Sequence, residues 1–429
     1  MKIKTYFLAS ACLMLLGACS TPPQEQPEKV AITAEQILGD AAYPALSYGG
    51  YRTSTRDNQP TIDQLKEDMV LLHAMGIRIL RTYNVHLPHA SNLLEAINQL
   101  QQERAGFEMY LMLGAWIDCK NAWTDLPPDH DQESERNKDE IAKAVELANK
   151  YPEIVKIIAV GNEAMVKWAT SYFVQPSVIL KWVNHLQALK ADGKLPKDLW
   201  ITSSDDFSSW GGGSTDYHTE DLNQLIRSVD YISMHTYPMH NTHYNPDFWG
   251  VMPAEDTLSK EEQIEKAMLR SIEFAQMQYD SVSSYMTSLG VDKPIHIGET
   301  GWATVDNHHY GVEGSKATDE YKGGRYYDLM RTWTSSANIS CFFFEGFDEP
   351  WKDAANQVGS ENHFGLFTID GQAKYALWPL VDEGLFDGLS RAGNQIRKTY
   401  NGDLDSLLQA VPFPPRKEAL VTYNGQSVE

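Results

Sequence analysis

The chain has 429 residues, 42% of them hydrophobic, which is enough to bury one large core, and its formal net charge is −22 at pH 7. A surface this acidic repels polyanions, so nucleic acid and heavily sulfated or uronic polymers are poorer ligands than a neutral glycan. Acidity that serves solubility alone would explain the same charge. The length allows more than one domain, so the number of domains has to be judged from the pattern of strands and helices.

The N-terminus has the features of a secretion signal. Two lysines precede an apolar stretch over residues 6–16, which is too short to span a bilayer. The motif Leu16-Gly17-Ala18-Cys19 resembles a bacterial lipoprotein signal, which implies cleavage before Cys19 and a lipid on its thiol. Ser20 in place of Asp resembles outer-membrane rather than inner-membrane lipoproteins. An ordinary signal peptide with an incidental cysteine is the alternative.

Composition divides the chain into four parts. Residues 1–18 are the expected signal peptide, and residues 19–40 are the expected lipidated cysteine and tether. The tether is polar and rich in proline over residues 21–29, which suits an extended linker. Residues 41–410 are expected to form a single domain, and residues 411–429 a tail on its surface.

Apolar runs and amphipathic stretches alternate through the domain, which predicts parallel strands joined by helices. The predicted strands are residues 45–48, 77–83, 108–115, 155–161, 200–204, 231–235, 294–298 and 340–344. The predicted helices are residues 62–75, 92–102, 139–150, 176–191, 220–227, 260–289 and 320–334. This order favours a closed (β/α)8 TIM barrel, with a cleft at the C-terminal ends of its strands, over an open doubly wound sheet.

Two glutamates stand at the ends of predicted strands. Glu163 ends the run Val160-Gly161-Asn162-Glu163, and Glu299 follows Ile297-Gly298. Glycoside hydrolysis with retention needs such a pair, because one carboxyl protonates the leaving oxygen while the other attacks the anomeric carbon. Glu163 as the acid needs a raised pKa, which burial and the charge of Glu299 would supply. A salt-bridged strand-end carboxylate is the alternative for either glutamate alone.

Asn162 stands directly before Glu163, where its amide can hold a sugar 2-hydroxyl whose contacts strengthen in the transition state. Gly161-Asn162-Glu163 together with Glu299-Thr300-Gly301-Trp302 resembles glycoside hydrolase family 17, the β-1,3-glucanase family of (β/α)8 retaining glycosidases. Supporting motifs cover most of the mature chain: Ser47-Tyr48-Gly49, Arg81-Thr82-Tyr83, Tyr237-Pro238, Asp348-Glu349 with Lys352, and Glu361 with Phe364-Gly365-Leu366-Phe367.

The resemblance implies roles for individual residues. Glu163 would be the acid/base and Glu299 the nucleophile, and the catalytic centre would be lined by Tyr48, Tyr83, Tyr237, Glu349 and Lys352. Ala303 stands where plant members usually have proline. Because proline fixes φ and alanine does not, this departure concerns the loop backbone rather than the chemistry.

Aromatic residues recur at predicted strand ends and in two long segments, residues 116–137 and 238–259, which we expect to rim the cleft. Sugar rings stack their C–H faces on such side chains, although core packing explains many tryptophans equally well. We expect Trp302 and Trp351 to be sugar platforms. The choice stays open for Trp116, Trp123, Trp210 and Phe347.

Three histidines, His235, His240 and His243, suggest a metal site, but their spacing matches no helical metal motif. A carboxylate pair needs no metal, so we expect neither a metal nor a cofactor. Asp205 and Asp206 either bind sugar hydroxyls or cap the next loop. An export compartment would permit a disulfide between Cys119 and Cys341, and the sequence leaves that pairing open.

The two strand-end glutamates predict a retaining glycosidase, and the resemblance to family 17 implies an endo-acting hydrolase of laminarin-type β-1,3-glucan. We expect a monomer that is anchored to the bacterial outer membrane or cell surface through Cys19 and binds neutral β-glucan but no nucleic acid. Two alternatives stay open. One is a β-1,3-glucan transglycosylase with the same site, and the other is a surface glycan-binding protein on an inactive barrel, which the presence of both glutamates disfavours.

Overall fold

The computed structural model describes residues 32–417, together with Met1. Eight parallel strands close into a barrel in the spatial order β1-β10-β9-β8-β7-β6-β3-β2. Their bounds are β1 (Ala45–Ser47), β2 (Ile79–Arg81), β3 (Tyr110–Ala115), β6 (Val155–Asn162), β7 (Trp200–Asp206), β8 (Ile232–His235), β9 (Ile295–Gly301) and β10 (Cys341–Phe344). Each corresponds to a predicted strand, and the (β/α)8 barrel is confirmed.

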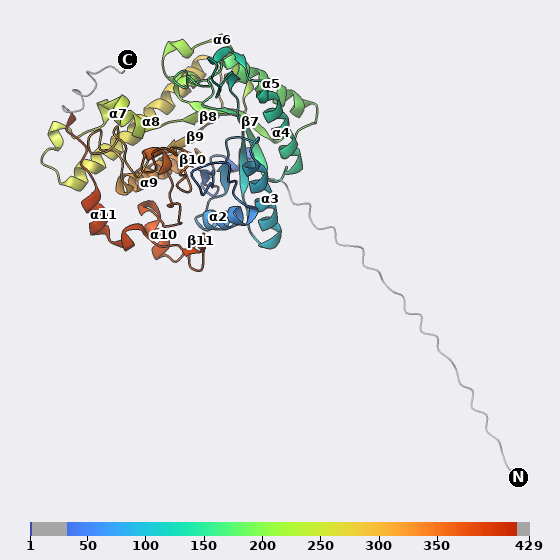
Figure 1. Cartoon of the computed structure of the whole chain (residues 1–429). Helices are drawn as coiled ribbons and strands as arrows, with labels where there is room; N and C mark the ends of the chain where they lie inside the picture. The colour runs from blue at the N-terminus through green and yellow to red at the C-terminus, as the bar shows by residue number, and fades with distance from the viewer. Residues whose placement is uncertain (2–31, 418–429) are drawn as a thin grey trace. The chain divides into compact units, whose positions relative to one another are not determined.

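Helices follow the barrel strands and surround them (Figure 1). They are α2 (Ile62–Ala74), α3 (Pro88–Glu103), α4 (Arg136–Lys150), α5 (Pro176–Ala191), α6 (Glu220–Ser228), α8 (Lys260–Ser288) and α9 (Glu320–Ser336). Their starts follow the chemistry of the sequence. Thr61 and Ser259 form capping boxes at α2 and α8, and Pro176 occupies the first turn of α5, where its missing N–H costs nothing.

The barrel strands read as apolar runs because helices cover their outer face and side chains fill the interior. All seven residues of β9 and the first seven of β6 are buried. One large cluster of buried side chains joins the strands to the helices, including Leu46, Leu80 and Ile158. The strands are therefore rigid supports for whatever stands at their C-terminal ends.

Smaller elements decorate the barrel. The helices are α7 (Pro238–Tyr244), α10 (Trp378–Asp382) and α11 (Leu404–Ala410), and the strands form two antiparallel pairs, β4 (Cys119–Lys120) with β5 (Asp129–Glu133) and β11 (Ser390–Arg391) with β12 (Asn394–Gln395). Short 3-10 or π turns occupy Ser208–Gly212, Thr215–Tyr217, Pro246–Phe248, Pro253–Glu255, Ser360–Asn362, Tyr375–Leu377 and Thr399–Gly402.

The tether predicted over residues 19–40 extends too far at its C-terminal end. Thr33 caps a short helix, α1 (Ala34–Ile37), whose Ala34 and Ile37 are fully buried. They pack in one cluster with Ala45 and other residues at the starts of the barrel strands, so α1 closes the N-terminal end of the barrel. The predicted signal peptide and Cys19 lie outside the described residues.

The first part of the predicted C-terminal tail lies against the barrel. Lys322 Nζ donates a hydrogen bond to the carbonyl of Pro412, and the amide of Val251 donates to Pro415. Cys119 and Cys341 are both buried and free, so they form no disulfide. Among the described residues, no helix is long and apolar enough to cross a membrane.

Candidate active site

The end of β6 has an irregular backbone that aims Glu163. Relative to β7, β6 carries one extra residue between Ala159 and Asn162, which is a β-bulge. Gly161 has φ +82°, and a Cβ there would lie 2.8 Å from the Cβ of Ala164, so only glycine fits. Glu163 itself has φ +46°, a conformation rarely kept without a functional reason.

Glu299 lies inside β9 rather than after it, which corrects the predicted end of that strand. The neighbouring strand β8 brings His235 opposite Glu299, because a one-residue irregularity follows Met234 in the pairing. The side chain of Glu299 is 9% exposed and that of Glu163 is 16% exposed. Both carboxyl groups are therefore desolvated, yet both reach solvent.

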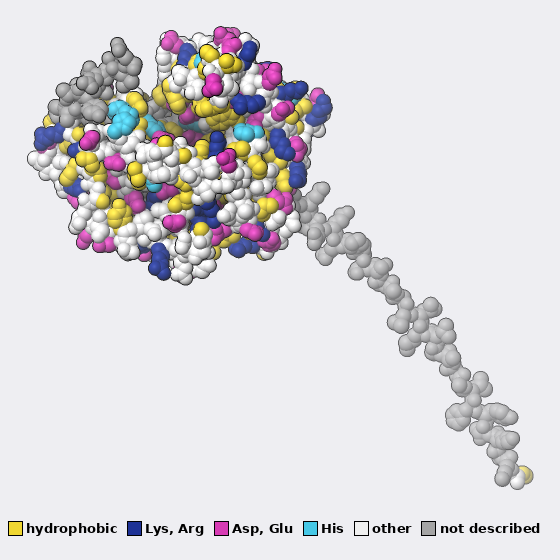
Figure 2. All heavy atoms as spheres, viewed as in Figure 1, with side chains coloured by type: hydrophobic (Ala, Val, Ile, Leu, Met, Phe, Trp, Pro, Cys, Tyr) yellow, Lys and Arg dark blue, Asp and Glu magenta, His cyan; other side chains and the backbone are white. Residues whose placement is uncertain are grey.

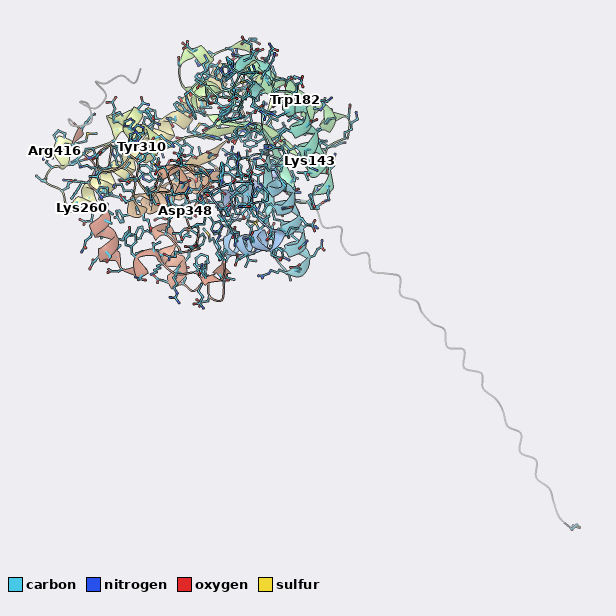
Figure 3. The ribbon with its side chains drawn as sticks, in the orientation of Figure 1. Lys143, Trp182, Lys260, Tyr310, Asp348 and Arg416 are labelled. Atoms are coloured by element: carbon cyan, nitrogen blue, oxygen red, sulfur yellow. The ribbon has the colours of Figure 1, made fainter. Side chains whose placement is uncertain are left out.

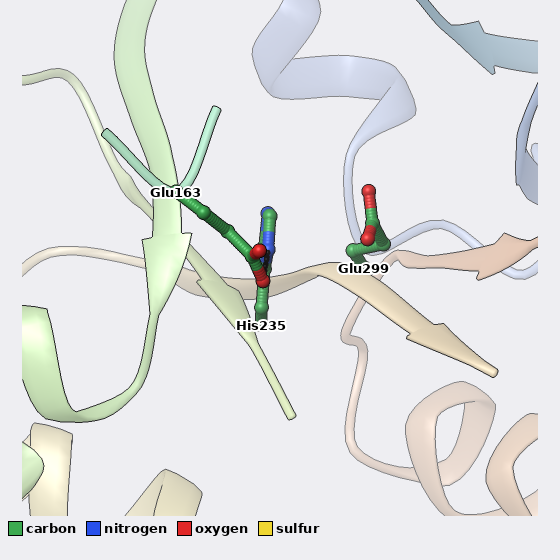
Figure 4. A group of neighbouring side chains, drawn as sticks. All are labelled: Glu163, His235 and Glu299. Atoms are coloured by element: carbon green, nitrogen blue, oxygen red, sulfur yellow. Dashed lines mark hydrogen bonds and ion pairs between the residues drawn. The ribbon is translucent and has the colours of Figure 1, made fainter. Parts of the chain in front are cut away.

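Glu163, His235 and Glu299 lie close together at the C-terminal ends of β6, β8 and β9, with β7 between β6 and β8 (Figure 4). Each side chain offers one oxygen or nitrogen atom, and these three atoms all lie within 4.8 Å of one another. Retaining glycosidases hold their two carboxyl groups about 5–5.5 Å apart, whereas inverting enzymes leave a wider gap for water. The separation of Glu163 and Glu299 fits the retaining arrangement.

Three side chains hold Glu299 as a carboxylate. Tyr237 donates a hydrogen bond of 2.7 Å to Oε1, Tyr83 donates one of 2.7 Å to Oε2, and the guanidinium of Arg81 pairs with Oε2. Burial alone would raise the pKa of Glu299, but Arg81 and the two tyrosine hydrogen bonds outweigh burial and lower this pKa below its usual value. Glu299 is therefore an ionised carboxylate near neutral pH.

Glu163 has the opposite electrostatic environment. Burial, followed by the charge of Glu299, raises the pKa of Glu163 well above its usual value. Its partner is His235, whose own pKa is lowered by burial to about 4, so the imidazole is neutral at working pH. A protonated Glu163 beside an ionised Glu299 is the combination that acid-assisted nucleophilic attack requires.

Asn162 lies beside this pair, half-buried, and its amide oxygen accepts a hydrogen bond from Arg81. Arg81 thus bridges Asn162 and Glu299. In the sequence, Arg81 stands out only as part of a motif and His235 only as a metal candidate. An arginine within a predicted buried strand, where an unpaired charge is costly, was the signal that could have identified Arg81.

Comparison with known proteins agrees with this geometry. Residues 45–365, about three quarters of the chain, match the family model described as the BtgE/BtgC glycoside hydrolase domain. The chain belongs to this family. The crystal structure of an endo-laminarinase from Formosa Hel1_33_131 is 63% identical, with a TM-score of 0.90, and the match covers 93% of this chain and 99% of that one.

Other relatives of this glycoside hydrolase are more distant. A protein of Aspergillus niger, named for glucan endo-1,3-beta-glucosidase activity, is 25% identical over 309 residues, which is 70% of this chain and 37% of the fungal one. The chain thus spans less than half the length of the curated relatives that it matches first. A glycoside hydrolase family 17 β-1,3-glucanosyltransferase from Rhizomucor miehei shares the fold, with 19% identity, a TM-score of 0.53, and coverage of 78% of this chain and 96% of that one.

The structure of this family member separates the expected sugar-binding residues into two groups. Tyr83 and Tyr237 contact Glu299, as described above. Lys352 is partly exposed, its ammonium lying 4.3 Å from the ring centre of Phe344 and 3.5 Å from a carboxyl oxygen of Glu349. Lys352 also lies 5.8 Å from the ring centre of Tyr83, so these three residues stand together beside Glu299, and their contact with a sugar stays a prediction.

Tyr48 and Glu349 do not line the cleft, because each is only 1% exposed. The hydroxyl of Tyr48 donates a 2.9 Å hydrogen bond to buried Asp68. Glu349 accepts a 2.9 Å hydrogen bond from the amide of Tyr51 and holds Lys352. Their burial contradicts the prediction that Tyr48 and Glu349 line the catalytic centre, although Glu349 pairs with Lys352, which does reach solvent.

Trp302 is also misassigned as a sugar platform. Its side chain is 1% exposed, and the ring packs against Tyr326 at 4.9 Å and Trp249 at 5.7 Å between centres. The indole Nε1 donates a 2.9 Å hydrogen bond to the carbonyl of Ala317. The ring is buried among protein side chains, so it presents no face on which a sugar could stack.

Trp351 remains available to a sugar. It lines a hollow of about 400 Å³ together with Arg56, His86 and neighbouring residues. The guanidinium of Arg56 lies 4.3 Å from the ring centre, and the buried indole Nε1 has no hydrogen-bond partner among the described residues. The predicted platform at Trp351 therefore stays a prediction that the geometry allows.

The remaining candidates divide between core and rim. Trp210 and Phe347 are buried, and Asp205 and Asp206 accept hydrogen bonds from the amides of Met165 and Ser208, which makes both aspartates loop caps. Two tryptophans lie beside the loop that follows Glu163, namely Trp116 and Trp123.

Histidines gather in the region of α7 (Figure 2). The ring centres of His243 and His309 lie 4.3 Å apart, and those of His308 and His309 lie 3.7 Å apart. Within the described residues, the group whose spacing suits a metal ion is Glu163 with His235 and Glu299. Arg81 already neutralises Glu299, so the carboxylate chemistry of this site needs no metal.

Proposed function

We propose that this protein is a retaining hydrolase that cleaves internal bonds of laminarin-type β-1,3-glucan. The observation that carries the proposal is the pair of glutamates within 4.8 Å, one with a raised pKa and one with a lowered pKa. Support for the substrate comes from the endo-laminarinase that is 63% identical over nearly the whole of both chains. The acidic surface is compatible with a neutral glucan.

The reaction has two steps. In the first, Glu163 gives its proton to the glycosidic oxygen while a carboxylate oxygen of Glu299 bonds to the anomeric carbon, which breaks the bond to the leaving sugar. In the second, Glu163 takes a proton from water, the water oxygen bonds to the anomeric carbon, and Glu299 is released. Two inversions give net retention. In this proposal Asn162 holds the 2-hydroxyl of the sugar between the two glutamates.

Product stereochemistry and chemical rescue test the proposal. Proton NMR of fresh laminari-oligosaccharide digests should show the β anomer first, and an α anomer appearing first would overturn the retaining mechanism. Glu163→Ala with azide should give a β-glycosyl azide, and Glu299→Ala with azide should give the α-azide, because azide replaces water in one case and the nucleophile in the other. Near wild-type laminarin hydrolysis by either variant without azide would refute the assignment.

A panel of β-1,3, β-1,4, mixed-linkage and β-1,6 glucans tests the substrate. We expect release of several short oligosaccharides from β-1,3 chains, since an endo enzyme cuts at internal bonds. A single small product released from chain ends would refute endo action. Binding to laminarin with no release of reducing sugar would instead favour the surface glycan-binding alternative.

Glucanosyl transfer is the second candidate. It uses the same covalent intermediate, and a sugar hydroxyl replaces water in the second step. Trp116 and Trp123, which pack against Tyr172 in the loop that follows Glu163, favour transfer because they offer surface for an acceptor sugar. Products longer than the donor oligosaccharide, detected by chromatography, distinguish transfer from hydrolysis.

We also propose export and lipid anchoring through Cys19, on the outer membrane or cell surface. The support is the sequence alone: a charged and apolar N-terminus, the motif Leu16-Gly17-Ala18-Cys19, and the proline-rich stretch that follows. A tethered monomer would act on soluble glucan next to the membrane.

A further inference from the structure

Trp123 combines two unfavourable features. Its large apolar side chain is 58% exposed, and its backbone conformation is strained. Trp123 lies in the loop between β4 and β5, and its φ of +63° is unusual for a bulky residue. Exposing an indole and straining its backbone are both unfavourable, so packing does not account for either. A residue held at such a cost is a candidate for contact with a ligand.

The ring of Trp123 is held in a fixed position by two other aromatic rings. It stacks on Tyr172 with 5.2 Å between centres and 23° between planes. Trp116 backs both rings, at 5.3 Å from Tyr172 and 6.3 Å from Trp123. One face of Trp123 is therefore supported, and its exposed part is presented as a preorganised surface.

Backbone contacts join this aromatic cluster, defined as Trp116, Trp123 and Tyr172, to the loop of the acid/base. Residues 164–174 directly follow Glu163, and the amide of Val174 closes that loop with a 2.7 Å hydrogen bond to the carbonyl of Ala164. The amide of Cys119 on β4 donates to the carbonyl of Tyr172 at 3.0 Å. The β4–β5 hairpin therefore supports the loop that carries Tyr172.

The cluster lies on the Glu163 side of the catalytic pair. Trp116 directly follows Ala115, which pairs with Val160 three residues before Glu163. Burial and then the charge of Glu163 raise the pKa of Tyr172, and Glu299 has a smaller effect, which agrees with the nearer position of Glu163. Because the general acid protonates the leaving oxygen, the leaving sugar extends on this side.

We propose that Trp123, supported by Tyr172, is the stacking platform for a glucosyl residue on the leaving-group side of the scissile bond, where an acceptor sugar also binds. This inference rests on the proposed function. The occupant follows from the position, since the sugar bound nearest to Glu163 is the leaving group in the first step and the acceptor in a transfer reaction. The exposed ring offers an apolar face to the C–H groups of a neutral glucose unit.

The test compares two substrates that differ only on the leaving side. Laminarihexaose has glucosyl units there, whereas β-laminaribiosyl fluoride loses a fluoride ion and leaves that side free of sugar. For Trp123→Ala we expect kcat/KM on laminarihexaose to fall about tenfold and kcat/KM on the fluoride to stay within about twofold of wild type. Transfer from the fluoride to added laminaritriose should fall by a similar factor.

Matched variants separate stacking from loop shape. Trp123→Gly suits the positive φ, so it removes the ring without backbone strain and should behave like Trp123→Ala. Trp123→Tyr keeps an aromatic face and should recover most of the lost activity. Phe413→Ala removes another exposed ring, which is 43% exposed and lies beside Lys260. In Figure 3, Lys260 is on the opposite side of the view from Trp182, whose indole donates a hydrogen bond to Glu133 of β5. Phe413→Ala should leave the rates on both substrates unaffected.

The outcomes are distinct from failure of the proposed function. If the wild type cleaves neither substrate, the hydrolase proposal itself fails. If the wild type cleaves both and Trp123→Ala loses the same factor on both, Trp123 is structural and the platform is refuted. If Trp123→Ala keeps wild-type rates on both substrates and wild-type transfer yields, the proposal that Trp123 is a platform is also refuted.

Discussion

His235 Nδ1 lies 3.0 Å from Glu163 Oε1, so a histidine from β8 holds the carboxyl of the residue that directly follows β6. The other ring nitrogen lies 2.8 Å from the hydroxyl of Ser204, which fixes the plane of the ring. Burial lowers the pKa of His235 to about 4, so the imidazole shares a hydrogen bond with Glu163 without adding a charge. His235 therefore positions the carboxyl that we propose as the general acid and leaves the raised pKa of Glu163 intact.

Loss of His235 should impair protonation of the leaving group more than nucleophilic attack. For His235→Ala we expect kcat/KM on laminarihexaose to fall about 100-fold, within the range of general acid catalysis. The rate on β-laminaribiosyl fluoride should change far less, because fluoride leaves without a full proton transfer. Stopped assays on both substrates measure this, and an equal loss on the two would contradict the positioning role.

The pH profile should be limited by the two glutamates in opposite directions. Activity needs ionised Glu299, so it persists above the lowered pKa of Glu299, and it needs protonated Glu163, so it declines above the raised pKa of Glu163. Arg81→Met removes the charge that lowers the pKa of Glu299. The acidic limb of kcat/KM should then move upward by about 1–3 pH units.

Tyr83→Phe is the control for the Arg81 prediction. It removes one hydrogen bond to Glu299 and leaves the charge of Arg81 in place, so the acidic limb should move in the same direction by a smaller amount. The alkaline limb should stay near its wild-type position in this variant. An acidic limb that does not move in Arg81→Met would show that Arg81 does not control the ionisation of the nucleophile.

Strand positions and the two glutamates could be predicted because their signals are local. A strand buried on both faces reads as an apolar run, as β9 does, and each glutamate lies in a short motif. The position of His235 could not be predicted, because a one-residue irregularity in the pairing of β8 with β9 sets it opposite Glu299 rather than Gly298. A regular ladder would have given a different neighbour.

The roles of the tryptophans could not be predicted either. Whether a tryptophan lies in the cleft or in the core depends on contacts with residues that are distant in the sequence. Trp302 turns into the core because Trp249 and Tyr326 enclose its ring. Nothing in the sequence around Trp302 reveals these contacts. The same holds for Tyr48, whose hydroxyl meets Asp68 on α2 rather than a sugar.

Trp302 and Trp351 should respond differently to substitution. Trp302→Phe leaves the buried carbonyl of Ala317 without its donor, so we expect a loss of about 1–3 kcal/mol in the free energy of unfolding, with unchanged KM. Trp351→Ala should raise KM for laminari-oligosaccharides and leave the melting temperature near the wild-type value. Thermal unfolding and steady-state kinetics measure both, and a raised KM in Trp302→Phe would restore it as a sugar contact.

Cys19 should decide where the protein resides in the cell. With Cys19 present, labelled palmitate should be incorporated and the protein should remain with the membrane fraction. Cys19→Ala should abolish labelling and release active enzyme in soluble form, because the barrel and the segments packed on it lie within residues 32–417, after the anchor. Retention of Cys19→Ala at the membrane would mean that something other than this lipid holds the chain there.

Gly161 should be needed for activity beyond its effect on stability. Its φ is +82°, and an added Cβ would lie 2.8 Å from the Cβ of Ala164 and 3.1 Å from Cδ1 of Ile179, so Gly161→Ala must shift the backbone that aims Glu163. Gly106→Ala is the matched control, because Gly106 has φ +81° with nothing within 4 Å of an added Cβ.

Both variants should lose about 1–3 kcal/mol of stability through strain. Only Gly161→Ala should also lose kcat, by about tenfold or more, since a small displacement of an acid/base is costly. Equal kcat in the two variants, measured below their melting temperatures, would show that the bulge of β6 does not aim the acid.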